Sequence, residues 1–226
     1  MRDFRYLAPQ LSGRLRFVRV DLPGFGGSAA ADEAIDSLTG RARAVLALAD
    51  HLGLARFSVL GHSMGGATAF VLAGEHRERV EQLVLISSVA LSLHRGLGLA
   101  PATYRRLASG LRLPVVGPLL VRLARAQYRR RRFPGAETLD AATLGLHLRA
   151  AAATDFPRIR RAVAGPLPPT LLAYARDDHM VETWISEELA RALPAARVLV
   201  FDEGGHNLQK TRALELGTAI REQLGV

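Results

Sequence analysis

Short runs rich in valine, leucine and isoleucine alternate with segments of helical periodicity along much of this chain. Such runs lie at residues 56–60, 80–86, 170–175 and 197–201. Short runs that are apolar throughout are typical of strands buried on both faces, and intervening helices favour parallel pairing. The pattern predicts an α/β fold with a mostly parallel sheet. Helices are expected at residues 36–51, 65–76, 182–193 and 210–224.

One more strand is expected near the start of the chain. Residues 15–20 alternate in polarity, and the glycine-rich segment Asp21–Ser28 follows them directly. Alternation that stops at a cluster of proline and glycine is typical of a strand that enters a loop. The sequence therefore predicts a strand at 15–20 and a loop after it.

The alternation of strands and helices lapses in the middle of the chain. Residues from 87 to about 168 are helical in pattern, rich in arginine and interrupted by prolines such as Pro101, Pro114, Pro118, Pro134 and Pro157. We expect a single domain whose core is formed by residues 1–87 and 168–226. Residues 88–167 are then a helical cap inserted into that core.

A nucleophile elbow is predicted between the run at 56–60 and the helix that follows it. Residues 61–66 read Gly-His-Ser-Met-Gly-Gly, a Gly-x-Ser-x-Gly segment. Small residues at Gly61 and Gly65 allow the sharp turn that leaves the oxygen of Ser63 protruding at the end of the strand. Ser63 is therefore the candidate nucleophile.

A serine hydroxyl needs a histidine to take its proton and a carboxylate to orient that histidine. Asp177 and Asp178 follow the run at 170–175, and His206 follows the run at 197–201. In an open parallel sheet these segments meet at the carboxyl ends of the strands. His206 is the candidate base, with His179 as its rival, and the two aspartates compete for the third role.

Four motifs in this order resemble the α/β-hydrolase superfamily, in its serine-nucleophile branch. The segments that carry the resemblance are Asp21–Ser28, Gly61–Gly66, Pro169–Asp178 and Gly204–His206. The resemblance implies the α/β-hydrolase fold and a catalytic triad of Ser63, Asp178 and His206. It selects Asp178 over Asp177 by the spacing from Ala175, where the family usually has glycine.

The resemblance also implies an oxyanion hole, of which Met64 supplies one backbone N–H at the start of a helix. The family's second donor comes from a loop after its third strand, usually led by a His-Gly pair. No such segment precedes Asp21. We therefore expect the first three strands to be absent and the natural gene to start further upstream.

The composition excludes several kinds of site, and the first residues indicate a location. The sequence contains no cysteine, which excludes a disulfide framework, a thiolate metal site and a cysteine nucleophile. No pair of histidines has the spacing of metal ligands, so neither a metal nor another cofactor is expected. The first residues lack the apolar core of a signal peptide, and a cytoplasmic location follows by default.

The net charge of +9 is carried almost entirely by arginine, because Lys210 is the only lysine. A solvated helical face is the favoured interpretation of the densest cluster, and nucleic-acid binding is not expected because no aromatic residues interleave with the arginines. Contact with anionic lipid is the alternative, since the apolar stretch 111–121 lies beside them. That stretch is otherwise expected to pack over the active site. The cluster comprises Arg122, Arg125, Arg129, Arg130, Arg131 and Arg132.

The leading hypothesis is a serine hydrolase that cleaves a carboxylic ester or related acyl substrate. Cleavage of C–C bonds, perhydrolysis and acyl transfer share the triad and stay open. The alternative from another class is a non-catalytic or weakly active fragment, or a ligand-binding relative. Its motivation is the missing oxyanion loop, because the loss of one donor typically lowers kcat by about 10²- to 10³-fold.

Overall fold

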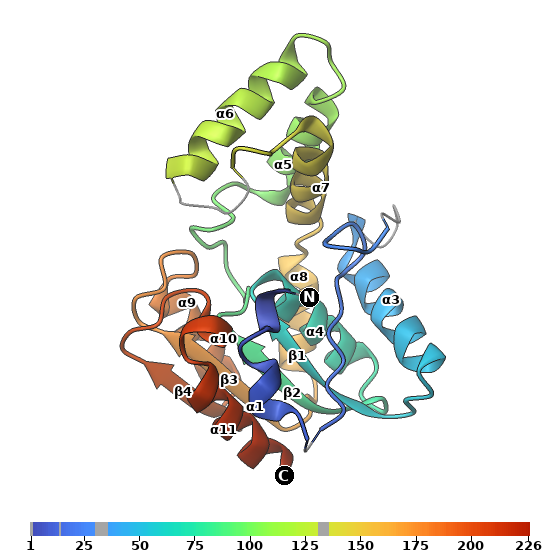
Figure 1. Ribbon diagram of the computed structural model, residues 1–226, viewed down its shortest axis with the longest axis vertical. Helices are drawn as coiled ribbons and strands as arrows, with labels where there is room; N and C mark the ends of the chain where they lie inside the picture. Colours follow the sequence, from blue (N-terminus) through green and yellow to red (C-terminus); the bar gives the residue numbers. More distant parts are fainter. Residues whose placement is uncertain (1, 14, 30–35, 131–135) are drawn as a thin grey trace.

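The sheet is parallel throughout and follows the order of the sequence (Figure 1). This computed structural model describes residues 2–13, 15–29, 36–130 and 136–226. Within them the strands pair in the order β1-β2-β3-β4. The four apolar runs predicted as strands at residues 56–60, 80–86, 170–175 and 197–201 are confirmed. Their bounds are Phe57–His62 for β1, Val80–Ile86 for β2, Thr170–Ala175 for β3 and Arg197–Phe201 for β4.

Helices cover both faces of this sheet, as expected for parallel strands joined by crossovers. One face carries α3 (Leu38–His51), α4 (Met64–Glu75), α8 (Phe156–Ala164) and α9 (Thr183–Ala192). The short helices η1 (Arg2–Phe4) and α10 (Leu208–Thr211) complete the core. The other face carries α1 (Ala8–Leu11) and α11 (Ala213–Leu224).

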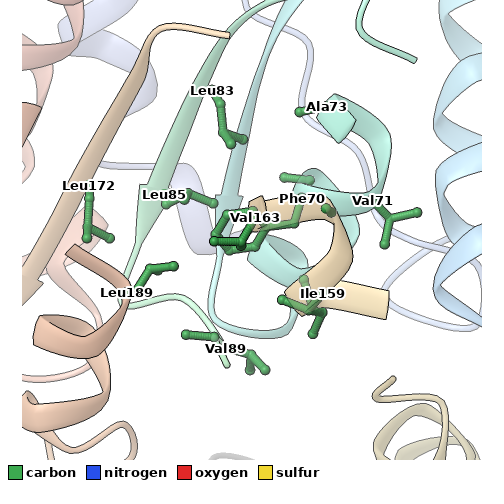
Figure 2. Close-up of a cluster of buried hydrophobic side chains, with 14 of the residues drawn as sticks. Phe70, Val71, Ala73, Leu83, Leu85, Val89, Ile159, Val163, Leu172 and Leu189 are labelled. Atoms are coloured by element: carbon green, nitrogen blue, oxygen red, sulfur yellow. The ribbon is translucent and has the colours of Figure 1, made fainter. Parts of the chain in front are cut away.

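Strand β2 shows why its second half, Leu83–Ile86, is apolar throughout. Leu83 and Leu85 pack into the larger core cluster, which Figure 2 shows with Phe70 of α4 and Ile159 of α8. The alternate residue Val84 points to the opposite face, against α1 and α11. Both faces of this half of the strand are therefore removed from water, and each fully buried aliphatic side chain contributes about 1.5–3 kcal/mol.

The strand predicted at residues 15–20 is wrong. Residues 16–20 make no strand pairing, and within the described sheet β1 pairs with β2 alone. The side chains still alternate at first, because Leu15 and Phe17 are half-buried against the core while Arg16 and Val18 are exposed. An alternating pattern records which side chains face the protein, whereas a strand also needs a neighbouring backbone.

Three helices of the inserted segment have a small apolar core of their own. They are α5 (Pro101–Gly110), α6 (Val116–Arg130) and α7 (Ala141–Ala152), and Figure 1 shows them grouped at one end of the molecule. Leu144 and Leu148 of α7 are buried in this cluster. The fourth helix, α8, packs against α4 instead. None of the helices in the described part of the chain is both long and apolar enough to cross a membrane.

The glycines of the elbow are not equally constrained. A Cβ atom on Gly61 would lie 2.6 Å from the carbonyl oxygen of Gly65, and one on Gly66 would collide with the side chain of Ser88. A Cβ atom on Gly65 would meet nothing within 4 Å. The expectation that Gly65 is the second sterically required glycine is therefore wrong, because Gly66 holds that position against the backbone after β2.

Gly66→Ala is expected to lower the free energy of unfolding by about 1–3 kcal/mol, because Ser88 and its backbone must shift to admit the methyl group. Gly65→Ala is the matched control one residue earlier in α4. It should leave stability unchanged or raise it by up to about 1 kcal/mol, since alanine is the better helix former. Urea unfolding of both variants measures the difference. Equal losses in the two variants would contradict this account.

Candidate active site

Ser63 is the single residue between β1 and α4, and its backbone has a conformation that few residues other than glycine adopt. Its φ and ψ are 52° and −120°, a strained region that costs on the order of 1–3 kcal/mol. Hydrogen bonds hold it there: its N–H donates to Ile86 (3.0 Å), and its carbonyl oxygen accepts from Gly66 (2.9 Å) and Val89 (3.0 Å). The turn and the neighbouring strand therefore fix the direction of the serine side chain.

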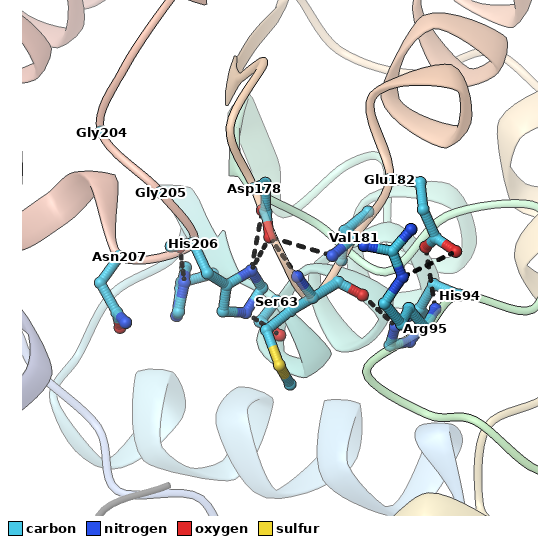
Figure 3. A network of polar contacts seen from close by, with 12 residues as sticks. Ser63, His94, Arg95, Asp178, Val181, Glu182, Gly204, Gly205, His206 and Asn207 are labelled. Atoms are coloured by element: carbon cyan, nitrogen blue, oxygen red, sulfur yellow. Dashed lines mark hydrogen bonds and ion pairs between the residues drawn. The ribbon is translucent and has the colours of Figure 1, made fainter. Parts of the chain in front are cut away.

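A chain of hydrogen bonds joins the three residues that the sequence predicts as a triad (Figure 3). The Nε2 atom of His206 lies 2.9 Å from Oγ of Ser63, and its Nδ1 atom lies 2.9 Å from Oδ2 of Asp178. Asp178 and His206 are 7% and 8% exposed, so water competes little for these contacts. The loops after β1, β3 and β4 thus bring the three side chains together.

The partners of His206 decide where its proton lies. A carboxylate only accepts, so Nδ1 of His206 donates to Asp178, and Nε2 is left to accept from the hydroxyl of Ser63. Burial alone would raise the pKa of Asp178, but the hydrogen bond and charge of His206, with the N–H groups of Val181 and Met180, lower it below its ordinary value. Asp178 is therefore ionised at neutral pH, as this arrangement requires.

The neighbouring aspartate has a different task. Asp177 accepts hydrogen bonds from the backbone N–H groups of Gly205 (2.7 Å) and Gly204 (3.2 Å). Those two glycines precede His206 and both have positive φ angles. Asp177 therefore holds the backbone of the histidine loop, whereas Asp178 contacts the imidazole itself.

The sequence did not reveal the contacts of His62 and Gln209. The Nε2 atom of His62 lies 2.9 Å from the carbonyl oxygen of His206, and Nδ1 lies 3.3 Å from Nε2 of the fully buried Gln209. A carbonyl only accepts, so Nε2 of His62 carries the proton and Nδ1 accepts from the amide. Only the variable position of His62 in the elbow motif hinted at this support for the histidine loop.

Burial and the nearby His206 lower the pKa of His62 from 6.5 to about 4, despite the hydrogen bond to the carbonyl of His206. Asp3 and Lys210 pair at 2.6 Å and have opposite effects on this pKa. The Asp3 carboxylate raises it, and the Lys210 ammonium lowers it. Because the folded state favours the neutral imidazole, this contribution to stability is complete above pH 6.5 and is lost as the pH falls towards 4.

The free energy of unfolding is therefore expected to fall by at most about 3 kcal/mol from His62 alone between neutral pH and pH 4. His62→Gln keeps a donor for the carbonyl of His206 but does not titrate, so its unfolding energy should depend less on pH across this window. Urea unfolding at a series of pH values compares the two slopes. An unchanged slope in the variant would refute the assignment.

The remaining histidines lie outside this hydrogen-bonded chain. His179, the rival base, is exposed, and so is His51. His94 is buried, and its Nδ1 atom accepts from the N–H of Leu97 at 3.2 Å. His147 is half-buried within α7, where its ring stacks on Phe25 at 6.2 Å between centroids.

Met64 is the first residue of α4. Its N–H has no acceptor one turn earlier within the helix, and the helix dipole adds partial positive charge at this end. The hydroxyl of Ser63 thus lies beside a place where a developing negative charge is stabilised. A hydroxyl, an imidazole, a carboxylate and a backbone N–H brought together at one sheet edge are the groups that acyl-transfer chemistry uses.

Known proteins share this arrangement of elements. A family model described as the alpha/beta hydrolase fold matches residues 1–213. The chain belongs to the alpha/beta hydrolase fold family. Hydrolases are among its relatives, and some of these are named esterases. The resemblance seen in the sequence is thereby confirmed, as is the fold.

Individual relatives cover different shares of the chain. It is 33% identical over 216 residues to the dihydrolipoyllysine-residue acetyltransferase component of the acetoin cleaving system of Pseudomonas putida, a match that covers 91% of this chain and 55% of that protein. The chain thus spans about half the length of this relative. It is 31% identical over 211 residues to a pimeloyl-(acyl-carrier protein) methyl ester esterase of Nitrosomonas europaea, covering 87% and 80%.

A solved structure supports the fold alone. The enol-lactonase of Burkholderia xenovorans superposes with a TM-score of 0.74 at 24% identity, covering 100% of this chain and 86% of that one. At this level of identity the likeness supports the architecture of this alpha/beta hydrolase but does not identify its substrate.

Proposed function

We propose that this alpha/beta hydrolase cleaves a carboxylic ester or related acyl substrate through an acyl-enzyme intermediate. Ser63 is the nucleophile, His206 the general base and acid, and Asp178 the residue that orients His206. The observation that carries the proposal is the continuous hydrogen-bonded chain, with contacts of 2.9 Å from His206 to Ser63 and 2.9 Å from His206 to Asp178.

In the first half of the reaction, Oγ of Ser63 attacks the carbonyl carbon of the ester while Nε2 of His206 takes the hydroxyl proton. The imidazolium that forms is stabilised by the ionised Asp178. The negative charge moves to the carbonyl oxygen, where the N–H of Met64 donates to it. Collapse of the tetrahedral intermediate breaks the C–O bond, and His206 returns its proton to the leaving alcohol.

The second half repeats these proton transfers with water as the nucleophile. Nε2 of His206 takes a proton from water, whose oxygen attacks the acyl carbon bound to Ser63. The tetrahedral intermediate releases Oγ of Ser63, which recovers its proton from His206. The products are a carboxylic acid and an alcohol, and the protein returns to its starting state.

Residues 88–167 are proposed as the cap that shapes the substrate site. Stacking of His147 on Phe25 joins α7 to the loop after residue 20, and the guanidinium of Arg149 contacts Asp36 at 2.7 Å and 2.8 Å. Apolar side chains of α5, α6 and α7 line a cavity of about 230 Å³. A cap that is tied to the core by such contacts restricts which acyl groups reach Ser63.

An ester linkage is favoured as the substrate because the Nitrosomonas europaea relative is named a methyl ester esterase. Two measurements test the proposal together. A fluorophosphonate probe should label the chain at Ser63, as located by peptide mass spectrometry, and a panel of nitrophenyl esters of increasing acyl length should show turnover. Absence of both labelling and turnover in folded protein would sink the proposal and leave the ligand-binding alternative.

A further inference from the structure

The positive charge of this protein is concentrated in one segment. Residues 82–136 contain ten arginines and no aspartate or glutamate. The rest of the chain carries the remaining 20 basic side chains and all 21 acidic ones, which leaves it with a net charge of −1. The net charge of +9 therefore arises from this segment. Its arginines are Arg95, Arg105, Arg106, Arg112, Arg122, Arg125, Arg129, Arg130, Arg131 and Arg132.

Helix α6 presents an apolar face to solvent within this segment. Leu119 and Leu123 are 54% and 58% exposed, and Val116 is also exposed. The other side of the helix, with Val121, Ala124 and Tyr128, packs against the apolar cluster shared with α5 and α7. Leu119 lies outside this cluster, and Leu123 borders the cavity with more than half of its surface exposed, so neither leucine is buried in the packing of the insertion. Much of the stretch 111–121, which the sequence led us to expect packed over the active site, is exposed.

The turn that leads into α6 continues the same apolar face. Leu113 is 53% exposed and Val115 is 82% exposed. Figure 1 shows this turn at the end of the molecule opposite the C-terminus, and α6 on the outer side of α5 and α7. We define the α6 outer face as Leu113, Val115, Val116, Leu119 and Leu123 with the exposed arginines Arg112, Arg122, Arg129 and Arg130.

Arginines flank the leucines on the helix surface. Arg122 and Arg129 lie on one side of the exposed stripe, and Arg130 lies one turn beyond Ala126. Leu123, Ala126, Gln127 and Arg130 together line a shallow hollow on this surface. Long arginine side chains can lay their methylene groups along apolar surface while the guanidinium groups reach phosphates above it. The α6 outer face can therefore present apolar side chains and guanidinium groups to the same interface.

We propose that the α6 outer face docks this protein onto lipid bilayers that contain anionic phospholipid. A helix with leucines on one face and arginines beside them lies in the plane of the interface, with the leucines among the acyl chains and the arginines at the headgroups. A second copy of this chain fits the face poorly, because the arginines of one copy would face those of the other. The nearby Glu137 could offset little of this repulsion, since it already pairs with Arg129 at 3.7 Å.

This proposal goes beyond the proposed hydrolase activity and does not depend on it. Flotation with vesicles of phosphatidylcholine and phosphatidylserine in a ratio of about 3:1 tests it directly. The full chain should float with these vesicles at low salt, stay behind with pure phosphatidylcholine, and bind less at about 0.5 M salt because the charges are screened. Absence of flotation at low salt would overturn the proposal.

Variants separate this surface from general positive charge. Arg122→Gln/Arg129→Gln/Arg130→Gln should weaken binding by about a hundredfold, at roughly a factor of five for each arginine. The matched control Arg16→Gln/Arg19→Gln/Arg191→Gln removes the same charge from exposed sites outside the segment and should change binding by less than about threefold. Equal losses in the two triple variants would refute docking through α6.

The leucines distinguish a bilayer from a soluble anionic partner. Leu119→Gln/Leu123→Gln preserves helix propensity and should weaken vesicle binding by about tenfold or more. Leu214→Gln in α11, where the leucine is 63% exposed, is the control that should bind as before. If the double variant binds vesicles normally while soluble polyaspartate competes fully, the face is an acidic-protein site and the proposal fails. Loss of self-association in the double variant would overturn it in favour of a second copy.

Discussion

Ser63→Ala is expected to lower kcat for the best nitrophenyl ester by about 10⁶-fold, because the reaction loses its nucleophile and the imidazole of His206 has no hydroxyl to activate. The methyl group of alanine fits where the hydroxyl was, so the fold should persist. Substrate binding should also persist, because Ser63 makes its covalent contribution after the ester is bound. Steady-state kinetics together with urea unfolding separate these effects.

The control for this prediction lies on the strand that precedes Ser63. Ser58 is exposed on β1, five residues before the nucleophile, and Ser58→Ala should leave kcat within about twofold of the original because surface serines contribute little. Retention of more than a hundredth of the activity in Ser63→Ala would mean that another group performs the attack. A comparable loss in Ser58→Ala would mean that the substitutions act through the fold.

Much of the fold could be predicted from the sequence because burial on both faces leaves a direct mark. The strands at 80–86 and 170–175 have the bounds expected from their apolar runs, since most residues that face either helical layer are apolar. Residues 15–20 show the limit of this reasoning. Their alternation was real, but pairing depends on a neighbouring backbone that no local pattern reports.

The candidate site shows the same division. The contact between Ser63 and His206 was predictable, since a strained turn requires glycines around it and the family motifs mark both loops. The sequence alone left Asp177 and Asp178 competing, because adjacent carboxylates differ in direction rather than in type. The contacts of His62 with His206 and Gln209 were missed, since they join residues that lie 144 and 147 positions apart in the sequence. Such contacts are decided by the packing of distant segments.

Asp178→Asn is the sharper test of the mechanism, with an expected loss of about 10⁴-fold in kcat at neutral pH. The reason lies in the partners of the carboxylate. The N–H groups of Met180 and Val181 donate to Oδ1 at 2.8 Å and 3.0 Å, so an asparagine would place its carbonyl oxygen there. Its amide N–H groups would then face Nδ1 of His206.

That orientation forces the wrong tautomer on the base. An amide N–H next to Nδ1 makes Nδ1 the acceptor, so the proton of the neutral imidazole moves to Nε2, which can no longer take the proton of Ser63. Nitrogen NMR of His206 should report this change of tautomer alongside the loss of kcat. The variant should remain folded, because both backbone donors keep an acceptor.

Asp177→Asn is the matched control, since it makes the same change one residue earlier. Its carbonyl oxygen can still accept from Gly205 or Gly204 but not from both, so the expected cost is about 0.5–1.5 kcal/mol of stability and less than about tenfold in kcat. The tautomer of His206 should stay as in the original protein. If Asp177→Asn loses as much activity as Asp178→Asn, the two carboxylates share the catalytic role and the assignment to Asp178 is wrong.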